Sequence, residues 1–433
     1  MTPRLLILIT LLLATSIGAY FYLQRQRPIA LAAERASPLR LVQEQDDFDE
    51  PYVSDPELIK ESANRKIAFP FKPGDRVAWI GSSSTYIGTW CKTMEFLLRS
   101  RHPDLNLTFS RHSAGGGTFE LAAERLPDWL ERSRPTLVFF NYGANDAAYG
   151  KNALNDFHQS MRLCMELTQH FGARAIQMTY QASDIRRTGA PAYYRRKHYA
   201  DDMLAFSKTN GWEIVDVFHP LENVQAQGQA LDSDFTINSD IIHLTDSAYI
   251  AWGFFLYDGL NALPAESSLE IDARDGHIVS AVNCKARVLS SDPLLAFERE
   301  DSVLPILPPT PLPDNNPYRS RIAARQLYGE TNYVPKYGQT LPPRQCVPLE
   351  KQSIYLLKIT GLAPGNYTLE CNDKPAGKAT EKQFAAGVNL NTLLLDAGVP
   401  APWNHLAEKL WDATPLADLE GRKLIFKIKL QSP

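Results

Sequence analysis

The chain has 433 residues, of which 44% are hydrophobic and 22% charged, and this composition is ordinary for a globular protein. A formal net charge of −4, without a long basic run, argues against nucleic-acid binding. The short basic stretch 195–198 falls near the start of a predicted helix and is interpreted as a solvated face. The length allows one large domain with a smaller one, or two medium domains.

The first predicted element is an apolar segment at the N-terminus. Residues 5–23 carry no charge and are flanked by arginines, Arg4 before the run and Arg25 and Arg27 after it. The run is long for a secretory signal and has about the length of a membrane-spanning helix. We therefore expect an exported protein that is periplasmic, secreted or membrane-anchored. Residues 1–27 are then either a cleaved signal peptide or a retained membrane tether.

A linker and an α/β domain are expected next. Residues 28–72 are polar, acidic around positions 46–50 and without periodicity, which predicts a linker. From residue 76, short apolar runs alternate with helical stretches, and this alternation predicts a parallel sheet covered by helices on both faces. The domain is expected over residues 73–264. Its predicted strands are 76–80, 105–109, 136–141, 173–180 and 213–218, and a last helix follows His243.

A small β-rich extension with a helical tail is expected over residues 265–433. Residues 304–317 are dense in proline and must be extended or turn-like. The β-like segments are 268–271, 277–284, 354–360 and 366–371. The turn at 362–366 has the residues of a hairpin turn and is expected to join the last two segments.

The five cysteines show no metal-binding spacing. Cys91 and Cys164 fall in helical patterns and are expected to be ordinary buried thiols. Cys346 and Cys371 could form a disulfide in an oxidising compartment, a pairing that the sequence leaves open.

Four short blocks supply the groups that acyl transfer requires. They are residues 81–85 (Gly-Ser-Ser-Ser-Thr), 113–118 (Ser-Ala-Gly-Gly-Gly-Thr), 142–146 (Tyr-Gly-Ala-Asn-Asp) and 240–243 (Asp-Ile-Ile-His). Three of them follow the first three predicted strands, and the fourth precedes the last helix. Each block alone is an ordinary turn, but ligands of a parallel sheet bind at the carboxyl ends of its strands. Together the blocks offer a hydroxyl, a base, a carboxylate and oxyanion donors.

Over roughly residues 76–263 these blocks resemble the SGNH branch of the GDSL esterase and lipase family. The resemblance implies a flavodoxin-like three-layer α/β/α sandwich. It implies that Ser83 is the nucleophile, His243 the base and Asp240 the carboxylate that orients the base. The backbone N–H groups of Ser83 and Gly116 and the side-chain amide of Asn145 would form the oxyanion hole. No metal or organic cofactor is implied. Residues 359–369 and 387–390 are similar to C-terminal extensions of some exported bacterial members.

One position departs from the family pattern. The Gly-Asp-Ser opening appears here as Gly81-Ser82-Ser83, so Ser82 replaces an aspartate. Because that aspartate is not the carboxylate of the triad, the chemistry is expected to survive. The three adjacent serines leave Ser82 and Ser84 as alternative nucleophiles.

The function implied by the resemblance is that of a serine esterase acting through an acyl-enzyme on small-molecule, glycan or lipid esters. A glycan O-acyltransferase with the same triad and an inactive binding protein on this fold are the alternatives. Asp184, Arg186, Arg187 and residues 193–198 follow the fourth predicted strand, where they either rim the pocket or form a solvated surface. The sequence does not determine the oligomeric state.

Overall fold

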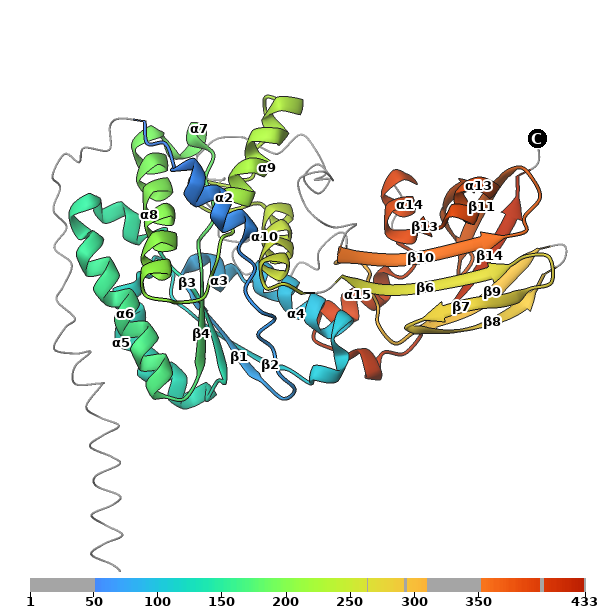
Figure 1. Ribbon diagram of the computed structural model, residues 1–433, viewed down its shortest axis with the longest axis horizontal. Coiled ribbons are helices and arrows are strands. Elements are labelled where there is room, and N and C mark those ends of the chain that lie inside the picture. The colour runs from blue at the N-terminus through green and yellow to red at the C-terminus, as the bar shows by residue number, and fades with distance from the viewer. Residues whose placement is uncertain (1–50, 263, 292–293, 310–351, 398–400, 432–433) are drawn as a thin grey trace, which may run out of the picture.

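The computed structural model describes residues 51–433 except 263, 292–293, 310–351, 398–400 and 432–433 (Figure 1). The apolar segment 5–23, Pro311, Pro313 and Pro317 of the proline-rich stretch, and Cys346 therefore lie outside the described residues. Among the residues that are described, no helix is both long enough and apolar enough to cross a membrane.

A five-stranded parallel sheet forms the centre of the first domain, in the order β2-β1-β3-β4-β5. Its strands are β1 Arg76–Gly81, β2 Thr108–Ser113, β3 Leu137–Asn141, β4 Arg174–Met178 and β5 Ile214–Val215. This strand order is that of the flavodoxin-like doubly wound fold. The side chains of β3 are all buried, as expected for a central parallel strand covered on both faces.

Helices α5, α6 and α8 lie on one side of this sheet, and α4 and α10 lie on the other (Figure 1). The α/β/α sandwich predicted from the sequence is thereby confirmed. The helices of this part are α2 Pro56–Asn64, α3 Ser83–Ile87, α4 Thr89–Arg101, α5 Phe119–Ser133, α6 Leu154–His170, α7 Ile185–Thr188, α8 Ala190–Thr209, α9 Phe218–Leu231 and α10 Asp246–Gly259. Short 3-10 turns are η2 Pro103–Leu105, η3 Asp146–Tyr149 and η4 Lys151–Ala153.

Two predicted strands differ from the observed ones. Strand β2 begins three residues later than expected, because the turn η2 and the left-handed Asn106 (φ 48°) come before it. Strand β5 has only two residues, because the carboxylate of Asp216 accepts the backbone N–H groups of Phe218 and His219 and so starts α9, a helix that the sequence pattern did not predict. The basic stretch 195–198 lies inside α8 rather than near its start.

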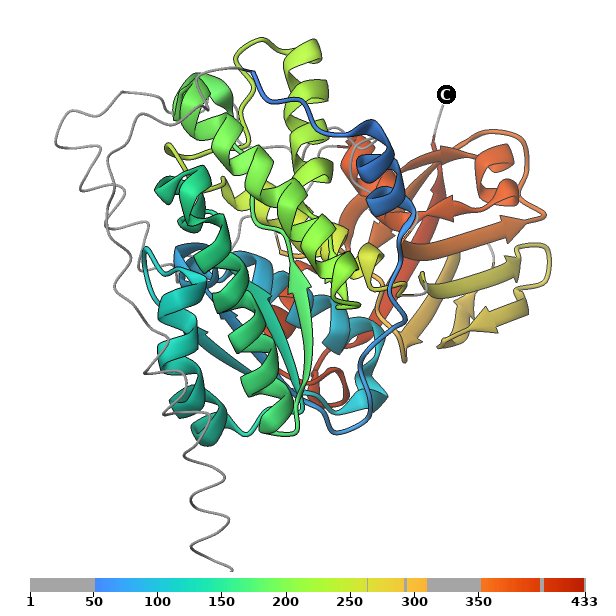
Figure 2. The ribbon, with the colours of Figure 1, turned by 60° about the vertical axis from the view of Figure 1, so that its left-hand side comes forward.

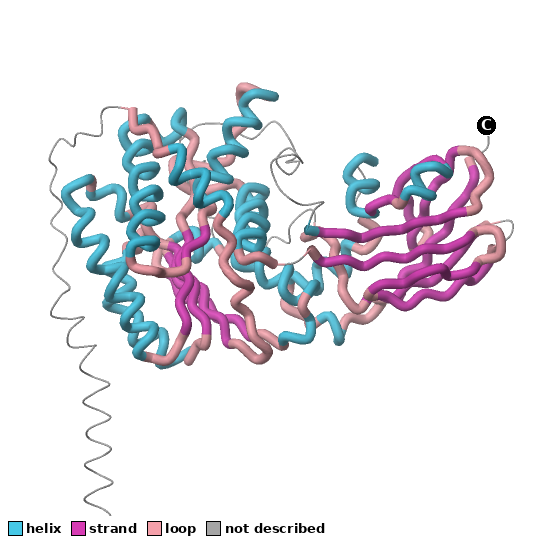
Figure 3. The backbone as a smooth tube through the Cα atoms, in the orientation of Figure 1, coloured by secondary structure: helices cyan, strands magenta, loops and turns pink. Residues whose placement is uncertain are grey.

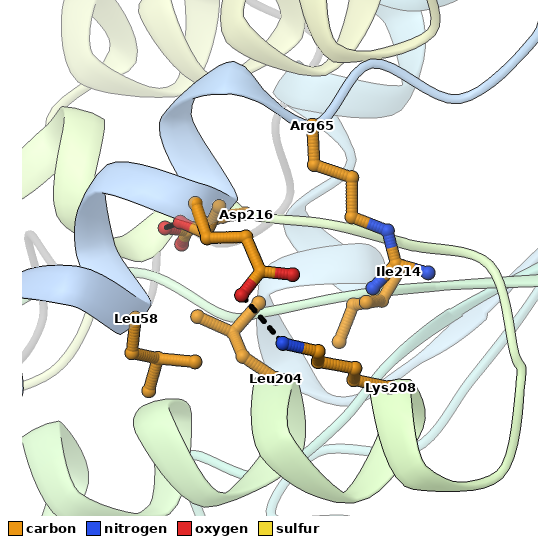
Figure 4. A pocket seen from close by; sticks show the side chains of 8 residues that line it. Leu58, Arg65, Leu204, Lys208, Ile214 and Asp216 are labelled. Carbon is orange, nitrogen blue, oxygen red and sulfur yellow. Dashed lines mark hydrogen bonds and ion pairs between the residues drawn. The ribbon is translucent and has the colours of Figure 1, made fainter.

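Residues 51–65 pack on the domain, whereas composition predicts a linker there. Helix α2 lies beside α8 (Figure 1). The hydroxyl of Tyr52 donates to Asp201 Oδ2 at 2.8 Å, and Ser62 Oγ donates to Asp216 Oδ2 at 2.7 Å. We call residues 51–65 the strap. Figure 4 shows the small pocket that the strap shares with α8 and β5, and it contains none of Ser83, Asp240 and His243.

Two further sheets make up the C-terminal part, which lies beside the α/β part in both views (Figures 1 and 2). One has the order β13-β10-β6-β7, and the other, fully antiparallel, has the order β12-β11-β14-β9-β8. Their strands are the magenta segments on the right of Figure 3. The strands are β6 Ala265–Asp272, β7 His277–Val282, β8 Cys284–Ser290, β9 Leu295–Asp301, β10 Ser353–Thr360, β11 Asn366–Cys371, β12 Lys374–Thr380, β13 Val388–Asn389 and β14 Lys423–Leu430. The helices are α13 Glu381–Ala386, α14 Leu390–Ala397 and α15 Asn404–Trp411, with the 3-10 turn η5 Leu416–Asp418.

The expected hairpin between residues 354–360 and 366–371 is wrong. Strand β10 pairs with β6 and β13, whereas β11 pairs with β12 and β14. Each strand is therefore paired on both edges within its own sheet, which leaves no edge for the other. The segment 277–284 divides into β7 and the start of β8, and the expected helical tail ends in the strand β14.

Helix α4 joins the two parts. The ring of Phe96 on α4 lies 6.4 Å from the ring of Trp411 on α15, and both side chains are buried. The backbone N–H of Leu304 donates to the carbonyl of Ser100 at 2.8 Å. Cys91 and Cys164 are buried free thiols, as expected. Cys371 is also a buried free thiol, and its proposed partner Cys346 lies outside the described residues.

Candidate active site

The turn that follows β1 accepts only glycine at its first position. A Cβ atom on Gly81 would lie 2.0 Å from Thr85 Oγ1 and 2.8 Å from the carbonyl oxygen of Asn141. The chain can therefore turn directly from the strand into α3, whose N-cap is Ser82 and whose first residue is Ser83. The side chains of Ser83 and Ser84 then meet different partners.

Of the three serines, Ser83 is the one that contacts the histidine. Its Oγ lies 2.9 Å from His243 Nε2. Ser84 Oγ instead receives a hydrogen bond from the buried hydroxyl of Tyr249 at 3.1 Å. Ser82 donates its backbone N–H to the carbonyl of Asn141 at 3.2 Å. The geometry therefore favours Ser83 over the two alternatives that the sequence left open.

Asp240 and His243 form a compact turn immediately before α10. Asp240 Oδ2 lies 2.7 Å from His243 Nδ1, and Asp240 Oδ1 accepts the backbone N–H groups of Ile242 at 2.8 Å and His243 at 2.6 Å. Burial raises the pKa of Asp240, but these hydrogen bonds and the nearby imidazole outweigh burial and hold that pKa below its usual range. Ser83, His243 and Asp240 thus form one continuous hydrogen-bonded chain.

Side chains from α7, α8 and the loop after β4 hold this turn by its backbone carbonyls. The carbonyl of Ile241 accepts from Thr188 Oγ1 at 2.9 Å and from Arg196 Nη1 at 3.2 Å. The carbonyl of Ile242 accepts from Gln181 Nε2 at 3.3 Å. Thr188 and Gln181 were not predicted as site residues, because a side chain that acts on a distant carbonyl leaves no motif or spacing in the sequence.

Asp184 and Arg186 brace the loop before Asp240. The guanidinium of Arg186 binds both carboxylate oxygens of Asp184 and donates to the carbonyl of Phe235 at 2.6 Å. The backbone N–H of Asp184 donates to Asn238 Oδ1 at 2.7 Å. These residues are therefore structural supports of the site.

Two residues of the stretch 193–198 connect helix α8 to helix α9. Lys197 Nζ donates to the carboxylate of Glu222 on α9 at 2.8 Å, and the hydroxyl of Tyr193 binds the same carboxylate. Arg196 alone in this stretch reaches the Asp240–His243 turn, and it does so through the carbonyl of Ile241.

The two remaining predicted residues lie on the loops that flank Ser83. Gly116 follows β2 and Asn145 follows β3, and these strands are the two neighbours of β1 in the sheet. Gly116 has φ 72° and is exposed, with open space where a Cβ would be. Asn145 Nδ2 donates to the carbonyl of Gly117 at 2.9 Å, so one N–H of its amide remains for another acceptor. The structure thus places both donors at the carboxyl end of the strands, on the same side of the sheet as Ser83.

No group of three or more His, Cys, Asp or Glu side chains that could hold a metal ion occurs in the described part of the chain.

Residues 75–251 match the GDSL-like Lipase/Acylhydrolase family. No curated protein sequence matches the chain. Among solved structures, the chain is similar to a gut microbial diltiazem-metabolizing enzyme, with 20% identity, a TM-score of 0.57 and coverage of 80% of this chain and 79% of that chain. It is also similar to the acetylxylan esterase Axe2 of Geobacillus stearothermophilus, with 14% identity, a TM-score of 0.38 and coverage of 44% of this chain and 95% of that chain. An α/β hydrolase enzyme from the metagenome of Lake Arreo matches at 17% identity and a TM-score of 0.39, over 45% and 98% of the respective chains.

The fold and the family match define the class of this protein, which is that of the carboxylic ester hydrolases. More specifically, its residues 75–251 are a GDSL-like lipase/acylhydrolase domain of the SGNH fold. The similarity to the diltiazem-metabolizing enzyme extends well beyond these residues, so it includes part of the fold of the C-terminal region.

Proposed function

We propose that the protein hydrolyses carboxylic esters with a triad of Ser83, His243 and Asp240. The observation that carries the proposal is the hydrogen-bonded chain from Ser83 Oγ through both ring nitrogens of His243 to Asp240 Oδ2. Asp240 accepts the Nδ1–H bond, which leaves Nε2 as the unprotonated nitrogen that takes the Ser83 proton.

The reaction proceeds in two acyl transfers. Ser83 Oγ attacks the ester carbonyl while His243 Nε2 takes its proton, and His243 then returns that proton to the departing alcohol. Water repeats the sequence on the acyl-enzyme and releases the carboxylic acid. The developing oxyanion is bound by the N–H groups of Ser83 and Gly116 and by the amide of Asn145. Each such donor typically lowers the barrier by about 3 kcal/mol.

We infer that the site accepts esters with a large alcohol part, such as a glycan ester outside the cytoplasm. Gly115 and Gly116 are exposed, and the side chain of Ile241, between Asp240 and His243, is 65% exposed. A site with such an open rim does not restrict the size of the leaving alcohol. Export through residues 5–23 would bring the enzyme to such substrates.

A serine-by-serine comparison tests the mechanism. Ser83→Ala should lose turnover of an aryl acetate by roughly 10⁴-fold or more, because the triad acts as a unit. Ser84→Ala removes a buried hydroxyl of similar size that contacts Tyr249, so it serves as the matched control and should keep its turnover per folded molecule. A p-nitrophenyl phosphonate should release p-nitrophenol and leave its phosphonyl group on Ser83, which mass spectrometry of the peptides detects.

Near-normal turnover of Ser83→Ala, or a phosphonate adduct on Ser82 or Ser84, would contradict the assignment. The substrate inference is checked by comparing acetylated polysaccharides with acetyl, butyryl and long-chain aryl esters. Turnover of small esters only would argue against a glycan substrate.

A further inference from the structure

Asp146 has no role in the triad or among the oxyanion donors, yet it lies between the two loops that carry those donors. It is the last residue of the block 142–146 and begins the short turn η3. Asp146 as a whole is only 5% exposed to solvent. A carboxylate buried this deeply is costly unless its oxygens accept hydrogen bonds.

Both oxygens of Asp146 are bound by backbone N–H groups, one from each loop. Oδ1 accepts the N–H of Phe119, the first residue of α5, at 2.9 Å. Oδ2 accepts the N–H of Gly143 at 2.9 Å. The first bond fixes the loop that carries Gly116, and the second fixes the loop that carries Asn145. A third bond, from Asn145 Nδ2 to the carbonyl of Gly117, closes the same connection.

We propose that Asp146 is a positioning residue that holds the Gly116 and Asn145 loops at the spacing needed to bind the oxyanion. The proposal rests on the proposed function, since it concerns the same site. Oxyanion donors act because they are fixed in place before charge develops, so a change in their spacing reduces transition-state binding more than substrate binding.

Only an ionised carboxylate satisfies both loops at once. An asparagine at this position would offer one oxygen acceptor, and its NH₂ group would face the N–H of the other loop. The site also favours a negative charge, because Oδ1 lies at the N-terminus of the 15-residue helix α5. Burial nevertheless exceeds the effect of the backbone hydrogen bonds and raises the pKa of Asp146 to about 6. The carboxylate is therefore ionised at pH 8 and gains a proton as the pH falls below 6.

The test is Asp146→Asn in the full chain, assayed at pH 8. We expect kcat to fall roughly 10²-fold, the usual effect of losing one oxyanion donor, with KM changed by less than about threefold. The affinity for a boronic acid that mimics the tetrahedral intermediate should fall in parallel with kcat. The advantage of the wild type over the asparagine variant in kcat/KM should shrink as the pH falls below 6, because Asp146 gains a proton there.

Asp75→Asn is the matched control. Asp75 is equally buried and also accepts a backbone N–H, that of Lys72 at 2.7 Å, but it lies before β1, at the opposite end of the sheet from Ser83. The Asp75→Asn substitution should lower the melting temperature, and it should leave kcat per folded molecule and the affinity for the boronic acid unchanged.

Asp146→Asn with unchanged kcat per folded molecule would overturn the proposal, as would a wild-type kcat that shows no loss as the pH falls below 6 if the variant does not fold. Ser83→Ala in the same assay distinguishes a failure of the proposed esterase function from a failure of the role proposed for Asp146. If it remains active, the proposed function itself fails. If it is inactive while Asp146→Asn is active, only the role of Asp146 fails.

Discussion

Two Asp-x-x-His turns with the same internal geometry occur in this chain, and they differ in the group that their imidazole contacts. In both Asp216–His219 and Asp240–His243, the carboxylate Oδ2 lies 2.7 Å from the imidazole Nδ1. The second nitrogen separates them, since His219 Nε2 lies 3.0 Å from Asp201 whereas His243 Nε2 lies 2.9 Å from Ser83. The Asp-x-x-His motif thus orients the imidazole, and the group that contacts its Nε2 atom determines whether the histidine can act on a serine.

This pair of turns provides a test with an internal control. Asp240→Asn should lower kcat by roughly 10⁴-fold with little change in KM, because an amide favours the wrong imidazole tautomer. Asp216→Asn alters the same motif away from Ser83, so it should lower the melting temperature and leave turnover per folded molecule intact. Steady-state kinetics and thermal unfolding on the same samples check both expectations. Equal losses of turnover in the two variants would argue against a triad role for Asp240.

The pKa of Asp240 also bears on the pH dependence of the rate. Because hydrogen bonds hold this pKa below its usual range, the carboxylate remains ionised throughout the neutral range. Titration of Asp240 should therefore contribute no step to the pH–rate profile near neutrality.

At the scale of elements, the strap is joined to the α/β domain through the second of these turns. The imidazole of His219 lies between the carboxylates of Asp216 and Asp201, which also accept hydrogen bonds from Ser62 and Tyr52 of the strap. Burial lowers the pKa of His219, but the two carboxylates outweigh burial and raise it to about 10. A protonated imidazole therefore holds α2 against α8 and the end of β5.

His219→Gln should destabilise the protein by about 3–5 kcal/mol near pH 6, because two buried carboxylates lose their cation. The folded-state pKa lies above the unfolded value of about 6.5, so the stabilisation is complete below pH 6.5 and is lost as the pH rises through 10. The difference in melting temperature between wild type and variant should therefore shrink from pH 6.5 to pH 10. Proteolysis should also cleave the strap of the variant faster.

His112→Gln serves as the control for this pH series. Burial lowers the pKa of His112, so its imidazole is neutral throughout the range. Its melting-temperature difference from wild type should stay constant between pH 7 and pH 10. If the difference in melting temperature were also constant for His219→Gln, a protonated His219 between Asp216 and Asp201 would be contradicted.

For the whole molecule, helix α4 connects the end of the sheet that carries Ser83 with the C-terminal part. Only Gly88 separates α4 from α3, the helix that carries Ser83. Phe96 of α4 packs against Trp411, and the carbonyl of Ser100 near the end of α4 accepts the backbone N–H of Leu304. The two parts thus share a buried interface, and the C-terminal sheets provide none of the five predicted site residues.

The proposed export belongs to this scale. Fractionation of the native host should recover the protein outside the cytoplasm or in the membrane, because residues 5–23 are too apolar to remain in water. N-terminal sequencing of the recovered protein distinguishes cleavage within the first residues from retention as a tether. A chain that lacks residues 1–27 should stay in the cytosol. Recovery of full-length soluble protein from the cytosol would contradict export.

The sequence by itself determined the parallel α/β sandwich and the approximate positions of its site blocks. Alternating apolar runs report local burial, and the carboxyl ends of parallel strands share one edge, so the blocks on the loops of that edge could be grouped by their order along the chain. The resemblance to the GDSL family then gave Gly116 and Asn145 their expected roles in the oxyanion hole.

The tertiary structure alone decided features that depend on contacts between distant residues. It distinguished Ser83 from Ser82 and Ser84 by the position of His243, and it packed the strap on α8 although its composition is that of a linker. It separated β10 and β11 into different sheets and buried Arg299 completely, where the guanidinium meets Asp301 and the carbonyls of Ser267 and Leu356. Local periodicity does not predict such pairings. The hydrogen-bonding partners of a strand or of a buried charge are determined only when distant segments of the chain come together.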